Sequence, residues 1–78
     1  MPFYYESVYW NSDFKDFGLA LKIQRKGVGL TQQELADLCG LDRTYICGLE
    51  NGRRNPSLKT LMKLSDALKL PIPHLLTF

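Results

Sequence analysis

The chain has 78 residues and a formal net charge of +2, which describes one small domain. This length excludes the large enzyme scaffolds, such as a (β/α)₈ barrel or a dinucleotide-binding domain. Charged residues make up 23% of the chain, and with so small a net charge this composition argues against disorder.

The sequence carries no sign of membrane insertion or secretion. No apolar run approaches the ~20 residues that a membrane span needs. The aromatic N-terminus lacks the basic and aliphatic parts of a secretory signal. We therefore expect a cytoplasmic domain without membrane contact.

Two cysteines and one histidine are too few for a protein zinc site, which needs four ligands. The three residues are Cys39, Cys47 and His74. A disulfide is improbable in a reducing compartment, so we expect both cysteines to be small buried apolar side chains. We expect no metal and no cofactor.

The first 17 residues differ in character from the rest. They hold seven of the nine aromatic residues and carry a charge of −2, whereas residues 18–78 carry +4. We expect residues 1–11 to form an N-terminal extension and residues 12–78 to form the folded domain. Three interpretations of the extension stay open: a strand or arm packed on its own core, an arm exchanged with a dimer partner, or an aromatic ligand-binding patch.

The body of the chain predicts successive short helices. The first is expected from about Asp13 to Lys26, with Ser12 as its N-cap and with Phe14, Phe17 and Leu21 on its inner face. The second begins with a capping box formed by Thr31 and Glu34, and Gly40 ends it. Asp42 is expected to cap a third helix that ends at Asn51. Ser57 is expected to cap a fourth, with leucines 58, 61, 64 and 68 on one stripe, and a last helical turn is expected near residues 74–77.

The spacing of four small or apolar residues makes the second and third helices a helix-turn-helix candidate. Ala36 suits a close helix crossing and Gly40 lets the chain reverse. Ile46 and Leu49 would anchor the third helix to the core, so that its opposite face is presented to solvent.

Residues 18–70 resemble the Cro/repressor type of helix-turn-helix domain, the xenobiotic-response-element family of bacterial and phage regulators. The motifs that carry this resemblance are GLTQQELA at residues 29–36, LDRTYI at 41–46 and LENGRRNPS at 49–57. The segment 41–46 and the small size also resemble the controller proteins of restriction–modification systems. The resemblance implies an all-α, five-helix, lambda-repressor-like domain that binds double-stranded DNA as a two-fold dimer.

Side chains near the start of the third helix are the expected readers of base edges in the major groove. Arg43 suits a bidentate contact to guanine, and Thr44 suits a base or a thymine methyl group. Tyr45 either touches DNA or packs on the neighbouring helix. Gly48 serves either a close approach to DNA or packing against a nearby helix. The full set of base-reading candidates is Arg43, Thr44, Tyr45, Cys47 and Gly48.

Phosphate contacts are expected at the start of the second helix, where free N–H groups favour an anion, and along the loop after the third helix. These candidates are Gln32, Gln33, Arg53, Arg54, Asn55, Ser57 and Lys59. By the family resemblance, Arg25 pairs with Glu50 in a structural bridge.

The apolar C-terminus is the expected dimer interface, because such residues are unfavourable in a free tail. Its members are Ile72, Leu75, Leu76 and Phe78. The sequence thus predicts a transcriptional regulator that binds a near-palindromic operator as a homodimer, with RNA polymerase as a further partner through Glu34 or Asp37. The alternative is an antitoxin or protein-interaction module with the same fold. No constellation of catalytic residues favours an enzyme.

Overall fold

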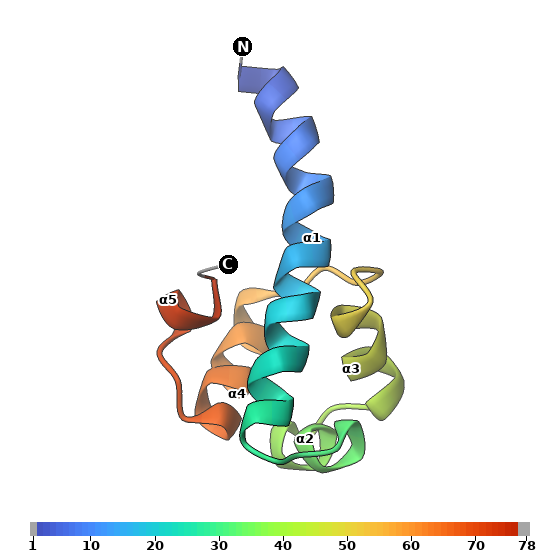
Figure 1. The fold of residues 1–78 in the computed structure, drawn as a ribbon, viewed down its shortest axis with the longest axis vertical. Coiled ribbons are helices and arrows are strands. Elements are labelled where there is room, and N and C mark those ends of the chain that lie inside the picture. Colours follow the sequence, from blue (N-terminus) through green and yellow to red (C-terminus); the bar gives the residue numbers. More distant parts are fainter. Residues whose placement is uncertain (1, 77–78) are drawn as a thin grey trace.

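The structure is a computed structural model that describes the backbone of residues 2–76 and the side chains of residues 14–76. That part of the chain contains helices and no strand (Figure 1). The helices are α1 (Pro2–Gly27), α2 (Gln32–Cys39), α3 (Arg43–Glu50), α4 (Leu58–Leu68) and α5 (Ile72–Leu75). The all-α, five-helix prediction is confirmed.

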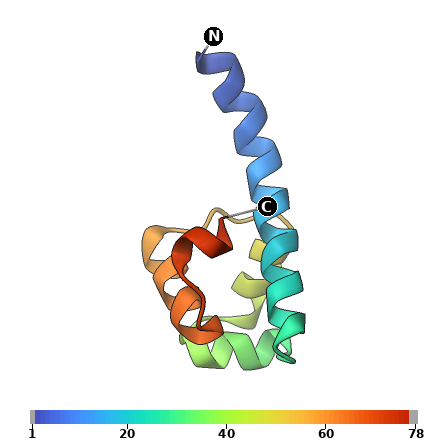
Figure 2. The same cartoon turned by 60° about the vertical axis from the view of Figure 1, so that its left-hand side comes forward.

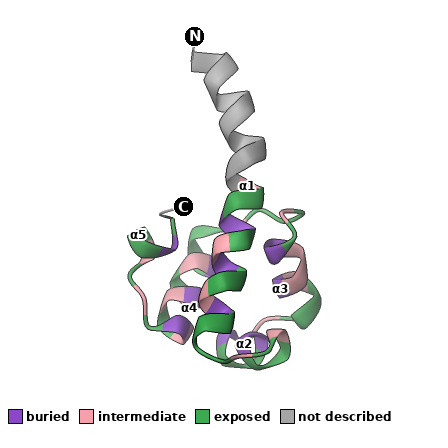
Figure 3. Cartoon of the chain, viewed as in Figure 1, coloured by how far each residue is buried: buried purple, intermediate pink, exposed green. Residues whose placement is uncertain are grey.

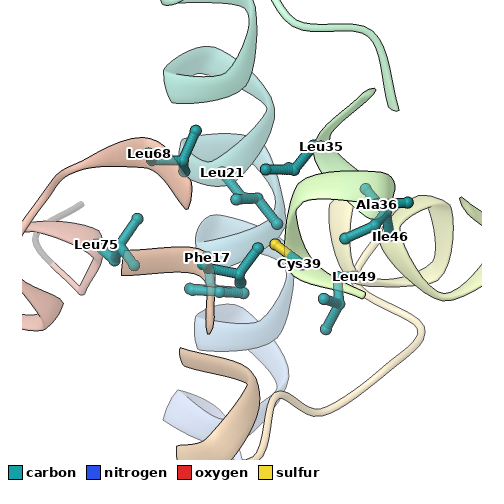
Figure 4. Packing of buried hydrophobic residues seen from close by; sticks show 10 residues of the cluster. Phe17, Leu21, Leu35, Ala36, Cys39, Ile46, Leu49, Leu68 and Leu75 are labelled. Atoms are coloured by element: carbon teal, nitrogen blue, oxygen red, sulfur yellow. The ribbon is translucent and has the colours of Figure 1, made fainter. Parts of the chain in front are cut away.

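The C-terminal half of α1 lies along the group formed by the other four helices (Figures 1 and 2). It packs against α3 and α5, while α2 packs against both α3 and α4. The space between them is filled by one apolar cluster (Figure 4), to which α1 contributes Phe17 and Leu21. The remaining members are Leu35, Ala36, Cys39, Ile46, Leu49, Leu64, Leu68 and Leu75.

The first helix is longer than expected, because it begins at Pro2 rather than near Asp13. Residues 3–17 contain neither glycine nor proline, and proline is tolerated in the first turn of a helix. Ser12 therefore lies within α1 and is not its N-cap, and the backbone of the extension is not a strand. The side chains of the N-terminal aromatic residues up to Trp10 lie outside the described part.

Most of the predicted helix ends are confirmed. The Thr31 hydroxyl accepts from the backbone N–H of Glu34 at 3.0 Å, and the Glu34 carboxylate accepts from the N–H of Thr31 at 2.8 Å. Gly40 has a φ of +67°, and the Ser57 hydroxyl accepts from the N–H of Thr60. Asp42 occupies the N-cap position of α3 but makes no capping hydrogen bond through its side chain.

Two expectations about leucines are wrong in part. Leu58 is exposed, whereas Leu64 and Leu68 of the same stripe are buried and Leu61 is half-buried. Leu75 is only 2% exposed and belongs to the core of its own chain, so it is not free to contact a dimer partner. Helix α5 starts at Ile72, two residues earlier than predicted. Phe78 lies outside the described residues.

The two cysteines are free, with Cys39 buried and Cys47 half-buried. The Cys39 thiol donates to the backbone carbonyl of Lys63 at 3.7 Å, and burial raises the pKa of this thiol. Within the described residues, no helix is long and apolar enough to cross a membrane.

Candidate nucleic-acid interface

The two central helices are joined by a short reversal at residues 40–42. The N–H of Leu41 donates to the carbonyl of Ala36, and the N–H of Gly40 donates to that of Asp37. This pair of bonds, with Gly40 in the left-handed region, is a Schellman ending. It satisfies the last carbonyls of α2 and directs the chain at once into α3.

One face of α3 is fully withdrawn from solvent, and the other is open. Ile46 and Leu49 are buried against the core, whereas Arg43 and Thr44 are exposed at the first turn. Cys47 and Gly48 follow on the open side and are half-buried. The outward placement of Arg43 and Thr44 agrees with the sequence prediction.

A buried ion pair fixes the other end of α3. The Arg25 guanidinium, on α1, donates from Nε to Glu50 Oε2 at 2.6 Å and from Nη2 to Oε1 at 3.1 Å. Its Nη1 donates to the backbone carbonyl of Leu30 at 2.7 Å. Gln32 Nε2, from α2, also donates to Glu50 Oε1, at 3.0 Å. One carboxylate therefore ties three helices together. The sequence predicted the pair of Arg25 with Glu50 but not the bond from Gln32.

The opposite charges of Arg25 and Glu50 compensate each other inside the protein. The side chains of Arg25 and Glu50 are 8% and 2% exposed, and each charge is satisfied by the other with bidentate geometry. Hydrogen bonding to Glu50 holds the pKa of Arg25 above its ordinary value, although burial acts in the opposite direction.

The two glutamines predicted as phosphate ligands both have protein partners. Gln32 gives one amide hydrogen to Glu50, and Gln33 donates to the Asp37 carboxylate at 2.9 Å. They stand at the first turn of α2, where exposed backbone N–H groups favour an anion. Gln32 is thus part of the structural network, and its phosphate contact stays a prediction.

Tyr45 packs on the neighbouring helix, one of the two alternatives that the sequence left open. Its hydroxyl lies 3.2 Å from Thr60 Oγ1 in α4, and Thr60 in turn accepts from the Ser57 hydroxyl at 3.0 Å. Tyr45 is half-buried. The Ser57 hydroxyl caps α4 and also donates to Thr60. Ser57 therefore has a structural role, and its phosphate contact stays a prediction.

The loop after α3 also has a Schellman ending. The N–H of Arg53 donates to the carbonyl of Gly48 at 2.9 Å, and the N–H of Gly52 donates to that of Leu49 at 3.1 Å. Gly52 has a φ of +73°. These bonds end α3, and the side chain of Arg54 comes to lie against Gly48 in its last turn.

Four exposed cations lie on α3, on the loop after it and at the start of α4, and four other exposed lysines lie on α1 and at the end of α4. The only ion pair among the described side chains is that of Arg25 with Glu50. Figure 3 shows exposed stretches in α3 and in the loop that follows it. The exposed basic residues of α3, the loop and the start of α4 have no ion-pair partner among the described side chains. They are Arg43, Arg53, Arg54 and Lys59. Asn55 is exposed among them, and such a surface suits a polyanion.

Sequence reasoning missed a glycine at the crossing of α1 and α3. A Cβ atom on Gly18 would lie 2.4 Å from the carbonyl oxygen of Leu49 and 2.6 Å from that of Glu50. No side chain fits there, so the backbones meet directly. The sequence signal was a glycine inside a helix, where it is otherwise unfavourable.

The chain resembles known regulators in sequence. A family model described as helix-turn-helix matches residues 21–75. Control protein C.MunI of Mycoplasma sp is 40% identical over 60 residues, which are 76% of this chain and 81% of that protein. Control protein C.SmaI of Serratia marcescens is 48% identical over 48 residues, or 62% of this chain and 57% of the relative's length.

A solved structure agrees with most of this arrangement. The restriction-modification controller protein C.AhdI from Aeromonas hydrophila has a TM-score of 0.80 and 44% sequence identity, and the match covers 82% of this chain and 97% of that one. This likeness confirms the lambda-repressor-like fold. The chain belongs to the helix-turn-helix family, in its Cro/repressor branch, and is a DNA-binding transcriptional regulator rather than an enzyme.

Proposed function

We propose that this protein binds a near-palindromic operator as a homodimer and reads it with α3 in the major groove. The observation that carries the proposal is the division of α3 into a buried face and an exposed first turn with Arg43 and Thr44. Side chains at the N-terminal end of such a helix reach base edges. We further propose that it acts as a controller in a restriction–modification system, which its similarity to the control proteins C.SmaI and C.MunI and to the controller protein C.AhdI supports.

The contacts divide into two kinds. Arg43 donates to the two major-groove acceptors of a guanine, and Thr44 contacts an adjacent base. The cations and amides that flank α3 bind phosphate and fix the register without reading sequence. These are Gln33, Arg53, Arg54, Asn55 and Lys59, together with the N-terminus of α2 beside Gln32.

A homodimer follows from the size of the reading element. An eight-residue helix contacts few base pairs, and two copies related by a two-fold axis double the number. Because Leu75 is buried, the interface is proposed to use the half-buried Ile72 and the exposed Leu76, with the half-sites about 34 Å apart. A contact to RNA polymerase is proposed for Asp37, which is exposed on α2.

The test is a binding selection from random duplexes, followed by two matched substitutions. Arg43→Ala is expected to cost about 1–3 kcal/mol and to relax the preference at one base pair of each half-site. Lys59→Ala is the control: it should weaken binding to all sequences about equally and lower the salt dependence by about one phosphate. An Arg43→Ala protein that loses affinity equally for every duplex would refute the base-reading role.

The dimer is tested separately. Sedimentation at micromolar concentration should give twice the mass of the chain, and selected sites should show two-fold symmetry. A monomer of 9.0 kDa that selects a single asymmetric site would contradict this part of the proposal.

A further inference from the structure

The backbone conformation at position 48 does not require glycine. It lies in the interior of α3, where glycine is less favourable than alanine, and its φ is not in the left-handed region that favours glycine. The structure offers another reason, because the place that a side chain would occupy is already filled.

The occupant is the side chain of Arg54. A Cβ atom on Gly48 would lie 2.7 Å from Cγ of Arg54, and 3.7 Å from its Cβ and its Nε. The aliphatic part of Arg54 therefore rests directly on the backbone of α3. Arginine commonly lays its methylene groups on a surface in this way while the guanidinium stays in water.

The loop backbone brings Arg54 to this place. The bonds from Arg53 to the carbonyl of Gly48 and from Gly52 to that of Leu49 return the chain to the last turn of α3. Arg54 is the next residue. Its position over Gly48 is thus set by the helix ending as well as by the missing side chain.

The position matters because of the face on which it lies. Gly48 follows Thr44 by four residues, so the two share one side of α3. In its second turn that side has only Cys47 and Gly48 and carries no cation. Arg54 is exposed and has no ion-pair partner among the described side chains, so it supplies the charge that the helix lacks there.

We propose that Gly48 is a positioning residue, which holds Arg54 across the DNA-facing side of α3 and so places its guanidinium against the phosphate backbone. This inference rests on the proposed DNA-binding function and adds to it the reason for the glycine. This proposal differs in one prediction from a direct approach of DNA to Gly48. It predicts that substitution of Gly48 weakens DNA binding only when Arg54 is present.

The experiment is a cycle of three variants, Gly48→Ala, Arg54→Ala and the double variant, each titrated with the selected duplex at several salt concentrations. We expect each single substitution to weaken binding about tenfold and to lower the salt slope by about one phosphate. The double variant should bind within about twofold of Arg54→Ala alone. Circular dichroism should show a folded protein throughout, because alanine favours a helix.

Two results would overturn the inference. One is a Gly48→Ala protein that binds as tightly as the parent. The other is an equal loss from Gly48→Ala when Arg54 is already alanine, which would mean that DNA itself needs the space. In both cases the parent still binds its operator, so the proposed function stands; a parent without any duplex preference overturns both.

A measurement without DNA tests the same contact. In the free parent protein, nuclear Overhauser effects should connect the Gly48 α-protons with the Cγ protons of Arg54. These signals should disappear in Gly48→Ala as the arginine side chain is displaced. Their absence from the parent protein would refute the positioning role, whatever the DNA-binding result.

Discussion

The buried pair between Arg25 and Glu50 yields the sharpest prediction about stability. We consider three variants: Arg25→Met, Glu50→Leu and both together. Each single substitution leaves one charge without its partner in a site where the two side chains are 8% and 2% exposed. The double variant removes both charges and fills the space with apolar groups of similar size.

The magnitude follows from what each remaining group retains. After Arg25→Met, the Glu50 carboxylate keeps only the bond from Gln32, and the loss should be about 3–5 kcal/mol, as for other broken buried pairs. After Glu50→Leu, Arg25 keeps its bond to the Leu30 carbonyl, so the loss should be near the lower end, about 3 kcal/mol. That loss corresponds to roughly 12–24 °C in Tm for a domain of this size.

The double variant should lose less stability than either single variant. Replacing both members of a buried pair by packed apolar residues is often nearly neutral. Here the Leu30 carbonyl and the Gln32 amide lose their partners as well, so some loss is expected. The single losses would add to more than the double loss by several kcal/mol, which is a direct measure of coupling.

Urea denaturation followed by circular dichroism is the assay, performed at about 15 °C, where small domains are near their maximum stability. If both single variants lose less than about 1 kcal/mol and the double variant equals their sum, the pair is not a structural bridge. The orientation of α3 would then have to be attributed to the apolar core alone.

Two further predictions concern packing. Gly18→Ala should destabilise the domain by about 1–3 kcal/mol in urea denaturation, because its Cβ would meet backbone atoms. The control is Gly27→Ala, which should be neutral or stabilising because nothing lies within 4 Å of the added Cβ. Equal effects of the two substitutions would contradict the close crossing of α1 and α3. Leu75→Ala should cost about 2–5 kcal/mol and Leu76→Ala, at a site 48% exposed, less than about 0.5 kcal/mol in the monomer, measured at low protein concentration. A larger loss of stability from Leu76→Ala than from Leu75→Ala would contradict the burial of Leu75.

Local signals in the sequence predicted the helix boundaries of the central unit. The capping box at Thr31 and Glu34, the glycine at position 40 and the cap at Ser57 each depend on residues only a few positions apart. A hydrogen bond between neighbours in the chain needs no knowledge of the fold. The predicted start of α1 was wrong. Ser12 is a good N-cap when it is judged by itself, but nothing in residues 3–17 ends a helix that starts earlier.

Contacts between distant segments were harder to predict. The position of Arg54 over Gly48 depends on a helix ending between them. The contact of Gly18 with the last turn of α3 joins residues more than 30 positions apart. Periodicity describes one helix at a time and does not say which helix it crosses. The pairing of Arg25 with Glu50 was predicted only because the family resemblance supplied the partner.

The orientation of α3 depends on α1, which lies outside the helix-turn-helix unit itself. An eight-residue helix is too short to be stable alone in water. It is held at its C-terminal end by Gly18, whose missing side chain lets the backbones meet, and by Arg25, which grips Glu50. Residues 28–57 without α1 would keep Arg43 and Thr44 but lose both supports. The proposed base reading by these exposed side chains therefore depends on the first helix, which fixes their direction.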